Sequence, residues 1–316
     1  MVHDLSITES TLVEAWVAAP LFGANVILFF LVVSVLVQRD PRNSLTARYL
    51  LVVTTTQLVL CTGHIATLLA KIVHAFVQLA DIPGATETYL ADFTMPLHAA
   101  EQALYTMNDI IAGGVLTWRC YVVFDHKWRP CAPLILASLG TAVTGIGSIA
   151  TLCTLPPGFG TFFSAPLQPW LTAFWLFSAL TQLGATSLLS YKIYSATAWR
   201  TRAEWALIRV FVEAGIVYSL GTLTVLVLYL FRTAAGTIVA GMLGQLSATA
   251  PYLIIVRAEA QRAHNIATYV TPRRDLSIDV PRSPTRRLDF GQRHESLALG
   301  KLQQAASSGP ELPPGW

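Results

Sequence analysis

Acidic and polar side chains lie inside segments that are otherwise apolar, and these residues could bind a ligand or move a proton. The richest such segment, 97–124, contains the two acids Glu101 and Asp109. In a bilayer, a charged side chain costs about 2.5–3.5 kcal/mol on insertion scales, so it has to face other protein groups. Glu101 and Asp109 are therefore the first candidates for a functional site.

The polar residues of 97–124 repeat at helical spacing. At 100° per residue they fall within about 120° of one another, which makes one continuous stripe. Such a stripe either lines a ligand cavity or forms hydrogen bonds that hold helices together, and the spacing favours neither interpretation. The stripe consists of His98, Glu101, Gln102, Tyr105, Asn108, Asp109 and Arg119.

Depth in the bilayer suggests partners for the two acids. Three polar residues of other apolar segments are expected at the depth of Asp109 and would form a polar layer with it: His64, Gln182 and Gln245. In that layer Asp109 is either protonated or paired with His64. Closer to the other end of its segment, Glu101 is expected to meet Lys71 or His74.

Arg119 and Glu213 are expected at similar depths near the other membrane surface. A buried pair between them would hold two helices together, and breaking such a pair costs about 3–5 kcal/mol. It could therefore act as a latch between two states of the protein. Alternatively, Glu213 pairs with Arg209, which lies four residues earlier on the same helix.

The composition indicates where these residues lie. Of 316 residues, 53% are hydrophobic and only 12% are charged, whereas soluble domains carry about 25% charged residues. Residues 130–191 contain no charged side chain at all. This composition excludes a soluble enzyme and a nucleic-acid-binding domain. The four cysteines lie in or beside apolar segments, so no disulfide framework is implied.

A helix that crosses a bilayer needs about 20 mostly apolar residues. The sequence predicts an all-α membrane protein, a bundle of seven transmembrane helices within residues 16–256, with Pro, Gly or charged residues marking the gaps. The predicted spans are 16–37, 49–77, 97–124, 131–155, 169–194, 207–230 and 236–256.

Basic residues orient the bundle. Seven spans place 19 of the 21 Lys and Arg residues on one side, which is the cytoplasmic side by the positive-inside rule. Residues 1–15 then form a short extracellular N-terminus, and the first span acts as an uncleaved anchor. Residues 257–316 form a basic, mostly disordered cytoplasmic tail, with a short helix allowed at 258–269. In this tail Thr271 and Ser283, each followed by proline, are candidate phosphorylation sites.

Several segments carry a resemblance to a known family. In these segments, the chain resembles a large family of seven-span proteins of mushroom-forming basidiomycete fungi: 96–105, 108–109, 118–123, 212–219 and 250–257. This resemblance implies an architecture rather than an activity. The topology is also similar to that of G-protein-coupled receptors. Arg119 and Tyr121 stand where those receptors carry the Arg and Tyr of their Asp-Arg-Tyr motif, with Trp118 in place of the Asp.

The predicted function is that of a receptor or sensor rather than an enzyme, with no metal or cofactor. Its partners would be the lipid bilayer, an unknown extracellular or membrane ligand and a cytoplasmic signalling partner, with no nucleic acid. The alternative is a proton-coupled transporter or channel that uses Asp109, Glu101 and His64. An intramembrane metal hydrolase is disfavoured because few ligands lie at compatible depth. The sequence predicts a multi-pass location without identifying the membrane.

Overall fold

A computed structural model of the chain describes residues 5–37, 45–196 and 202–270. Within these ranges, the side chains of 45, 193, 196, 202–214, 254 and 258–270 are not described. Almost all of the described residues belong to one compact unit, Met1–Tyr269. Apart from its first residue, the second unit, Val270–Trp316, lies outside the described ranges.

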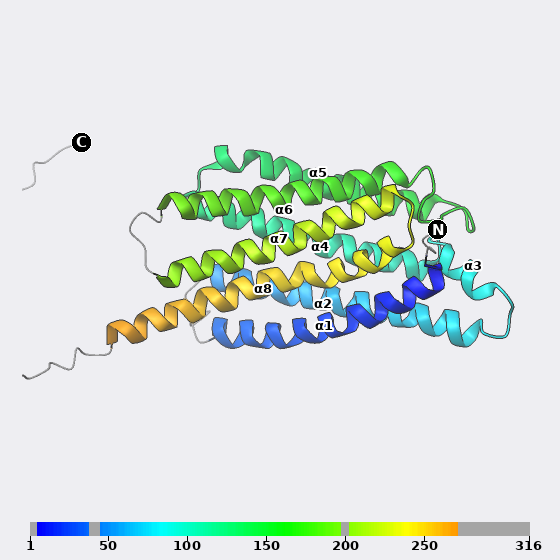
Figure 1. Ribbon diagram of the computed structural model, residues 1–316, viewed down its shortest axis with the longest axis horizontal. Helices are drawn as coiled ribbons and strands as arrows, with labels where there is room; N and C mark the ends of the chain where they lie inside the picture. The colour runs from blue at the N-terminus through cyan, green and yellow to red at the C-terminus, as the bar shows by residue number, and fades with distance from the viewer. Residues whose placement is uncertain (1–4, 38–44, 197–201, 271–316) are drawn as a thin grey trace, which may run out of the picture. The chain divides into compact units, whose positions relative to one another are not determined.

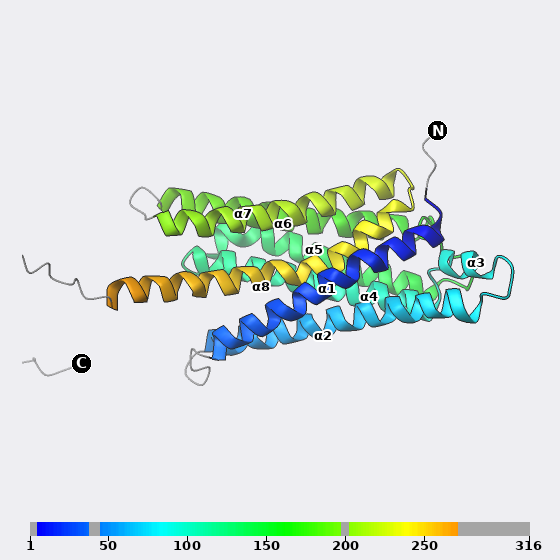
Figure 2. The ribbon, with the colours of Figure 1, turned by 60° about the horizontal axis from the view of Figure 1, so that its bottom comes forward.

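Seven long helices run along the compact unit, and the described residues contain no strand (Figures 1 and 2). A short helix, α3 (Ala85–Ala91), lies at one end, which we call the α3 end. The π-helical turn η1 (His74–Gln78) continues the second long helix. The long helices are α1 (Ile7–Val37), α2 (Leu45–Val73), α4 (Pro96–Val123), α5 (Trp128–Thr154), α6 (Gln168–Ala196), α7 (Arg202–Leu230) and α8 (Ala235–Val270).

Helix α1 begins at Ile7, nine residues before the predicted first span. The extension follows from a capping box at its start. The backbone N–H of Glu9 donates to the Ser6 hydroxyl at 3.2 Å, and the backbone N–H of Ser6 donates to the Glu9 carboxylate at 3.0 Å. These reciprocal bonds satisfy donors that a helix start leaves free. The extra turns carry Glu14 into the bundle, where it is buried.

Helix α4 is central in the bundle, because it packs against α2, α5 and α6. Helix α8 also reaches α4, since the Asn108 side chain donates to the carbonyl of Gly244 at 2.7 Å. Further along α8, the Tyr252 hydroxyl donates to the carbonyl of Thr54 on α2 at 2.8 Å. The helix with the most polar side chains is therefore surrounded by other helices, as the stripe required.

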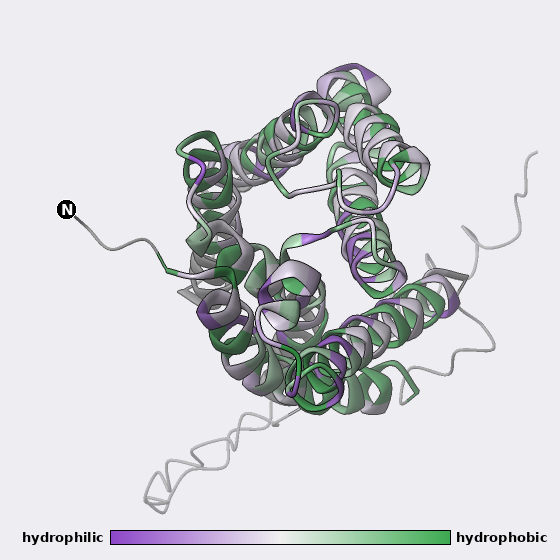
Figure 3. Cartoon of the chain, turned by 90° about the vertical axis from the view of Figure 1, so that its right-hand side faces the viewer, coloured by the Kyte–Doolittle hydropathy of each residue, from purple (hydrophilic) through white to green (hydrophobic). Residues whose placement is uncertain are grey.

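The polarity of the bundle is the reverse of that of a soluble protein. Buried side chains from four helices include Asn25, Gln57, Asp109 and Gln245, all at most 2% exposed. Large apolar side chains point outward instead, as Ile27, Val52, Val59, Leu136 and Val143 do, each more than 60% exposed. Figure 3, viewed from the α3 end, shows hydrophobic residues along the outside of the ring of helices. A continuous apolar exterior suits lipid better than water.

Four helical segments are long and apolar enough to cross a membrane: Ile7–Val37, Thr46–Gln78, Trp128–Thr154 and Ala235–Arg257. The search covered only the described residues, and of α7 it finds a shorter apolar segment, Gly215–Leu230. Helices α4 and α6 do not meet the same criterion. The fold is thus compatible with an integral membrane protein whose more polar helices are packed among apolar ones.

Candidate functional site

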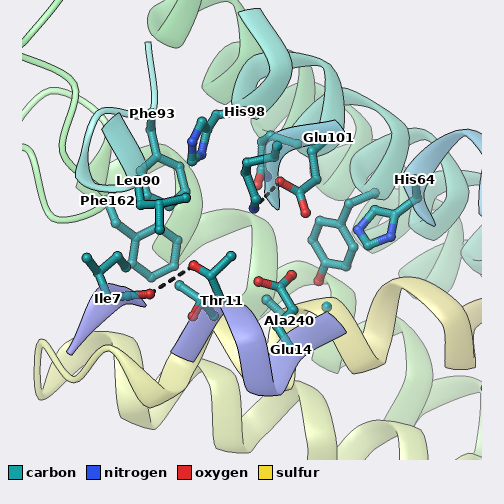
Figure 4. Close-up of a pocket in the computed structure, with 15 residues that line it drawn as sticks. Ile7, Thr11, Glu14, His64, Leu90, Phe93, His98, Glu101, Phe162 and Ala240 are labelled. Carbon is teal, nitrogen blue, oxygen red and sulfur yellow. Dashed lines mark hydrogen bonds and ion pairs between the residues drawn. The ribbon is translucent and has the colours of Figure 1, made fainter. Parts of the chain in front are cut away.

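A cavity near the α3 end contains most of the charged side chains that the bundle buries. Its lining comes from α1, α2, α3, α4 and α8 and from the segments that connect α3 to α4 and α5 to α6. Its volume, measured for the centres of water-sized spheres, is about 40 Å³. We call it the charged cavity (Figure 4). Five of the nine predicted cavity residues line it: His64, His98, Glu101, Gln102 and Tyr105.

An ion pair crosses the charged cavity between α2 and α4. The Lys71 ammonium donates to Glu101 Oε2 at 2.5 Å, and both side chains are buried. This confirms the predicted meeting of Glu101 with Lys71. The alternative partner, His74, instead contacts Gln78 within η1. The second oxygen of Glu101, Oε1, is buried without a hydrogen-bond partner.

Glu14 brings a second carboxylate to this ion pair. It projects from α1 into the charged cavity, opposite Glu101 (Figure 4), and it interacts electrostatically with both Lys71 and Glu101. The sequence prediction missed Glu14 because it placed residues 1–15 outside the bundle. The Ser-x-x-Glu pattern at Ser6 and Glu9 was the signal that could have extended the helix to include it.

Two histidines line the charged cavity in different ways. His98 is 2% exposed, and neither of its ring nitrogens has a hydrogen-bond partner. Its ring packs between Tyr89 and Phe93, with ring centroids 5.5 and 5.1 Å away. His64 Nδ1 lies 3.3 Å from the amide nitrogen of Gln245. An amide nitrogen can only donate, so His64 Nδ1 accepts and the imidazole is neutral.

Two aromatic side chains, Phe93 and Phe162, cover the charged cavity, and we call them the roof (Figure 4). Their rings lie 5.1 Å apart. The backbone N–H of Phe93 donates to the carbonyl of Gly160 at 2.8 Å, which joins the α3–α4 and α5–α6 segments. A side chain at Gly160 would collide with Thr94, since its Cβ would lie 2.2 Å from Thr94 Cγ2.

Asp92 accepts hydrogen bonds from both of the segments that carry the roof. Its Oδ1 accepts from the backbone and the hydroxyl of Thr94 at 3.0 and 2.6 Å, and its Oδ2 accepts from the backbone N–H of Gly158 at 2.8 Å. Gly158 has a φ of 87°, a left-handed conformation that glycine adopts without strain. Burial opposes ionisation of Asp92, but these hydrogen bonds outweigh it and lower the pKa of the carboxyl.

Below the charged cavity, a polar seam joins α1, α4 and α8. Asn25 donates to the carbonyl of Gln245 at 2.8 Å and accepts from the Thr249 hydroxyl at 2.6 Å. Asn108 donates to the Ser247 hydroxyl at 2.6 Å. Neither Asn108 nor Gln245 lines the charged cavity. These two predicted cavity residues hold helices together, which was the alternative interpretation of the stripe.

Asp109 lies apart from the charged cavity. It accepts a hydrogen bond from the Tyr218 hydroxyl of α7, and its Oδ2 has no hydrogen-bond partner. With Gln182 it lines a separate pocket of about 10 Å³, on the same measure, between α4, α5 and α6, which is space for about one water molecule. Asp109 therefore pairs with Tyr218 rather than with His64. The expected single layer of Asp109, His64, Gln182 and Gln245 is two separate clusters.

The structure describes Arg119 fully, but it describes the other remaining predicted residues only in part or not at all. One Arg119 nitrogen donates to the carbonyl of Pro251 on α8 at 3.5 Å, and another is buried without a hydrogen-bond partner. The side chain of Glu213 is not described, so the Arg119–Glu213 latch stays a prediction. Thr271 and Ser283 lie outside the described residues.

Comparison of the chain with protein-family models, with curated proteins and with solved structures found no match. The resemblance to the basidiomycete family therefore stays a prediction. Within the described residues, no group of three or more His, Cys, Asp or Glu side chains is arranged to hold a metal ion.

Proposed function

We propose that the protein crosses a membrane seven times, with its N-terminus outside and its C-terminus in the cytosol. Three observations support this: four apolar helices of sufficient length, an apolar exterior around a polar interior, and an uneven distribution of Lys and Arg. In this orientation the α3 end faces outward and the α4–α5 connection faces the cytosol. The charged cavity then lies near the outer surface.

Within this architecture we propose the function of a receptor or sensor that binds a small ligand in the charged cavity. The observation that carries the proposal is a set of buried polar atoms without partners, Glu101 Oε1 and both His98 nitrogens, in two residues that line this cavity. Buried polar groups in native proteins are nearly always hydrogen-bonded. A bound molecule would supply these missing partners, and its arrival would alter packing between α1, α2, α4 and α8.

The proton-coupled alternative needs Glu101, His64 and Asp109 along one route. Glu101 and His64 line the charged cavity, whereas Asp109 lies in a different pocket and bonds to Tyr218. This separation favours ligand binding over a proton route. Proteoliposomes that contain a pH-sensitive dye test the choice. A receptor gives no protein-dependent proton flux, whereas a flux that Glu101→Gln abolishes would support the transporter.

The topology can be tested with single cysteines in intact cells. The native Cys153 is exposed and the other three cysteines are buried, so Cys153→Ser gives a background of low reactivity. In that background, Asp81→Cys reports on the α3 end and Lys127→Cys on the α4–α5 connection; both residues are exposed. A membrane-impermeant maleimide should label the first before permeabilisation and the second only afterwards. Labelling of both before permeabilisation contradicts the proposal.

A cytoplasmic signalling partner is expected to dock on the basic connections at the opposite end from α3. Proximity labelling from an enzyme fused after residue 316 would identify it. Recovery of GTP-binding protein subunits would support coupling of the type that the receptor topology suggests. A substrate-uptake defect in a deletion strain would support the transporter instead.

A further inference from the structure

The charged cavity contains more acidic than basic side chains. Glu14 and Glu101 supply two carboxylates, and Lys71 supplies one ammonium. His64 does not balance the charge, because its Nδ1 accepts from Gln245 and the ring is neutral. His98 does not balance it either, since a charged imidazole needs an acceptor at both nitrogens and His98 has none.

Buried charges without compensation are costly. The cluster of Glu14, Glu101 and Lys71 therefore needs either a proton on one carboxylate or a further cation. Glu101 Oε1 is available for a cation, because Lys71 is bonded to the other oxygen. Figure 4 shows the Glu14 and Glu101 carboxylates directed toward a shared space from opposite walls. A positively charged donor between them would interact with both.

The other end of the charged cavity is apolar. The roof, Phe93 and Phe162, lies on the side away from His64, together with Leu90 and Ile7 (Figure 4). Aromatic faces favour both apolar groups and cations. The cavity therefore has two carboxyl groups at its floor and an aromatic cover, and its volume of about 40 Å³ is space for about three or four water molecules or a ligand of similar size.

We propose that the charged cavity binds a small organic amine in its ammonium form, with the charge between Glu14 and Glu101 and the apolar body under the roof. This inference rests on the proposed ligand-binding function. Anions are disfavoured because Lys71 already interacts with two carboxylates. A neutral ligand would need a proton on one of the two carboxyl groups, whereas an ammonium group binds to both in their charged form.

Binding can be measured with the full chain in lipid nanodiscs by calorimetry and by thermal unfolding. Three probes that match the volume of the cavity share a propyl group and differ in charge: propylammonium, 1-propanol and butyrate. We expect only the ammonium probe to bind and to raise the unfolding temperature. Glu14→Gln should weaken its binding about tenfold or more, since a charge-assisted contact is lost. The matched control is Glu87→Gln on α3, an exposed residue outside the cavity, which should leave binding unchanged.

Other results overturn the inference. Equal binding of the alcohol would show a merely apolar cavity, and preferred binding of butyrate would make Lys71 the recognition group. An unchanged affinity in Glu14→Gln would remove the proposed contact. If no probe binds while the cysteine labelling gives the proposed topology, the amine inference fails and a proton neutralises the cluster. If the labelling gives another topology, the proposed function itself fails.

Discussion

The Glu14 carboxylate of α1 lies against the backbone of Gly241 on α8. A Cβ placed on Gly241 would come within 2.4 Å of Glu14 Oε1 and 2.5 Å of its Cγ. Only a glycine therefore lets α8 approach closely enough for Glu14 to sit in the charged cavity. This contact ties the outer turns of α1 to the helix that also carries the polar seam.

Gly241→Ala should move the Glu14 carboxylate while leaving the fold intact. The nearest atoms to the added methyl group are Cγ, Cδ and Oε1 of Glu14, a flexible side chain that has to rotate away, and alanine favours a helix interior by about 1 kcal/mol over glycine. We expect a change of less than about 1 kcal/mol in stability and a clear loss of propylammonium binding. Gly236→Ala, also on α8, is the control, because its Cβ would meet Leu228 at an ordinary 3.6 Å. Unchanged binding in Gly241→Ala would contradict this role.

Lys71→Met should destabilise the protein strongly. It leaves two buried carboxylates without their cation, and breaking a buried ion pair in this way costs about 3–5 kcal/mol. Adding Glu101→Gln to Lys71→Met should restore part of the loss, because the double variant buries one charge fewer. Thermal unfolding of both variants in nanodiscs measures the effect.

A surface pair provides the comparison for Lys71. Lys192 lies 3.6 Å from Asp125, and both side chains are at least one-third exposed. Exposed pairs contribute about 0–1 kcal/mol, so Lys192→Met should change stability by less than about 1 kcal/mol. If the two Lys→Met variants lost similar stability, burial would not be the cause of the Lys71 effect.

Asp92→Asn should loosen the roof. At least one of the three hydrogen bonds to Asp92 is lost, because an amide nitrogen cannot accept, and we expect a cost of about 1–3 kcal/mol. Hydrogen exchange should increase at 92–95 and 158–162. Asp81→Asn, at an exposed position in the preceding connection, is the control and should leave exchange there unchanged.

The Asp92 contribution should also depend on pH. Although burial raises the pKa of this carboxyl, the hydrogen bonds from Thr94 and Gly158 lower it further, to below the usual 3.8. A lowered pKa in the folded state adds stability above pH 3.8 that is lost as the pH falls through the folded pKa. The difference in stability between the native chain and Asp92→Asn should therefore be constant near neutrality and shrink below pH 3.8. A difference that persists at lower pH would mean that the charge is not involved.

Tyr218→Phe should destabilise the centre of the bundle by about 1–3 kcal/mol, because Asp109 then keeps a buried oxygen without its donor. His64→Ala removes a residue of the other cluster and should leave the surroundings of Asp109 unchanged. Infrared difference spectra of the Asp109 carboxyl distinguish the two variants. A larger effect of His64→Ala on that band would support the pairing expected from depth alone.

The sequence predicted the positions of the long helices well, because apolar length and Pro, Gly or charged gaps determine where a helix can cross lipid. The described ends of α4 and α5 lie within three residues of the predicted ones. The start of α1 and the end of the last span were wrong because hydropathy ignores polar turns that continue a helix beyond its apolar part. Helix α8 continues without a break from the predicted end at 256 to Val270. The short helix α3 was missed because it has no long apolar run.

The site was predicted only in part, and the reason is geometric. Depth gives the height of a side chain along a helix but not the direction in which it points around the axis. Lys71 and Glu101 met as expected, since opposite charges at one height attract across α2 and α4. Asp109 and His64 are at similar heights, yet Asp109 points toward α7 and His64 toward α8. Rotation of each helix depends on packing that one sequence does not reveal.

The α3–α4 and α5–α6 segments, which carry the roof, affect how fast a ligand could leave the charged cavity. Asp92 and the Phe93–Gly160 hydrogen bond join these two segments above the charged cavity. A ligand could therefore leave on this side only while the two segments are apart. For the ligand proposed above, the lifetime of the bound state would then be governed by the opening of these segments, while the carboxyl groups below would govern the affinity. Under the proposed receptor function, two ligands of equal affinity would therefore differ in how long they stay bound, according to how each one contacts Phe93 and Phe162.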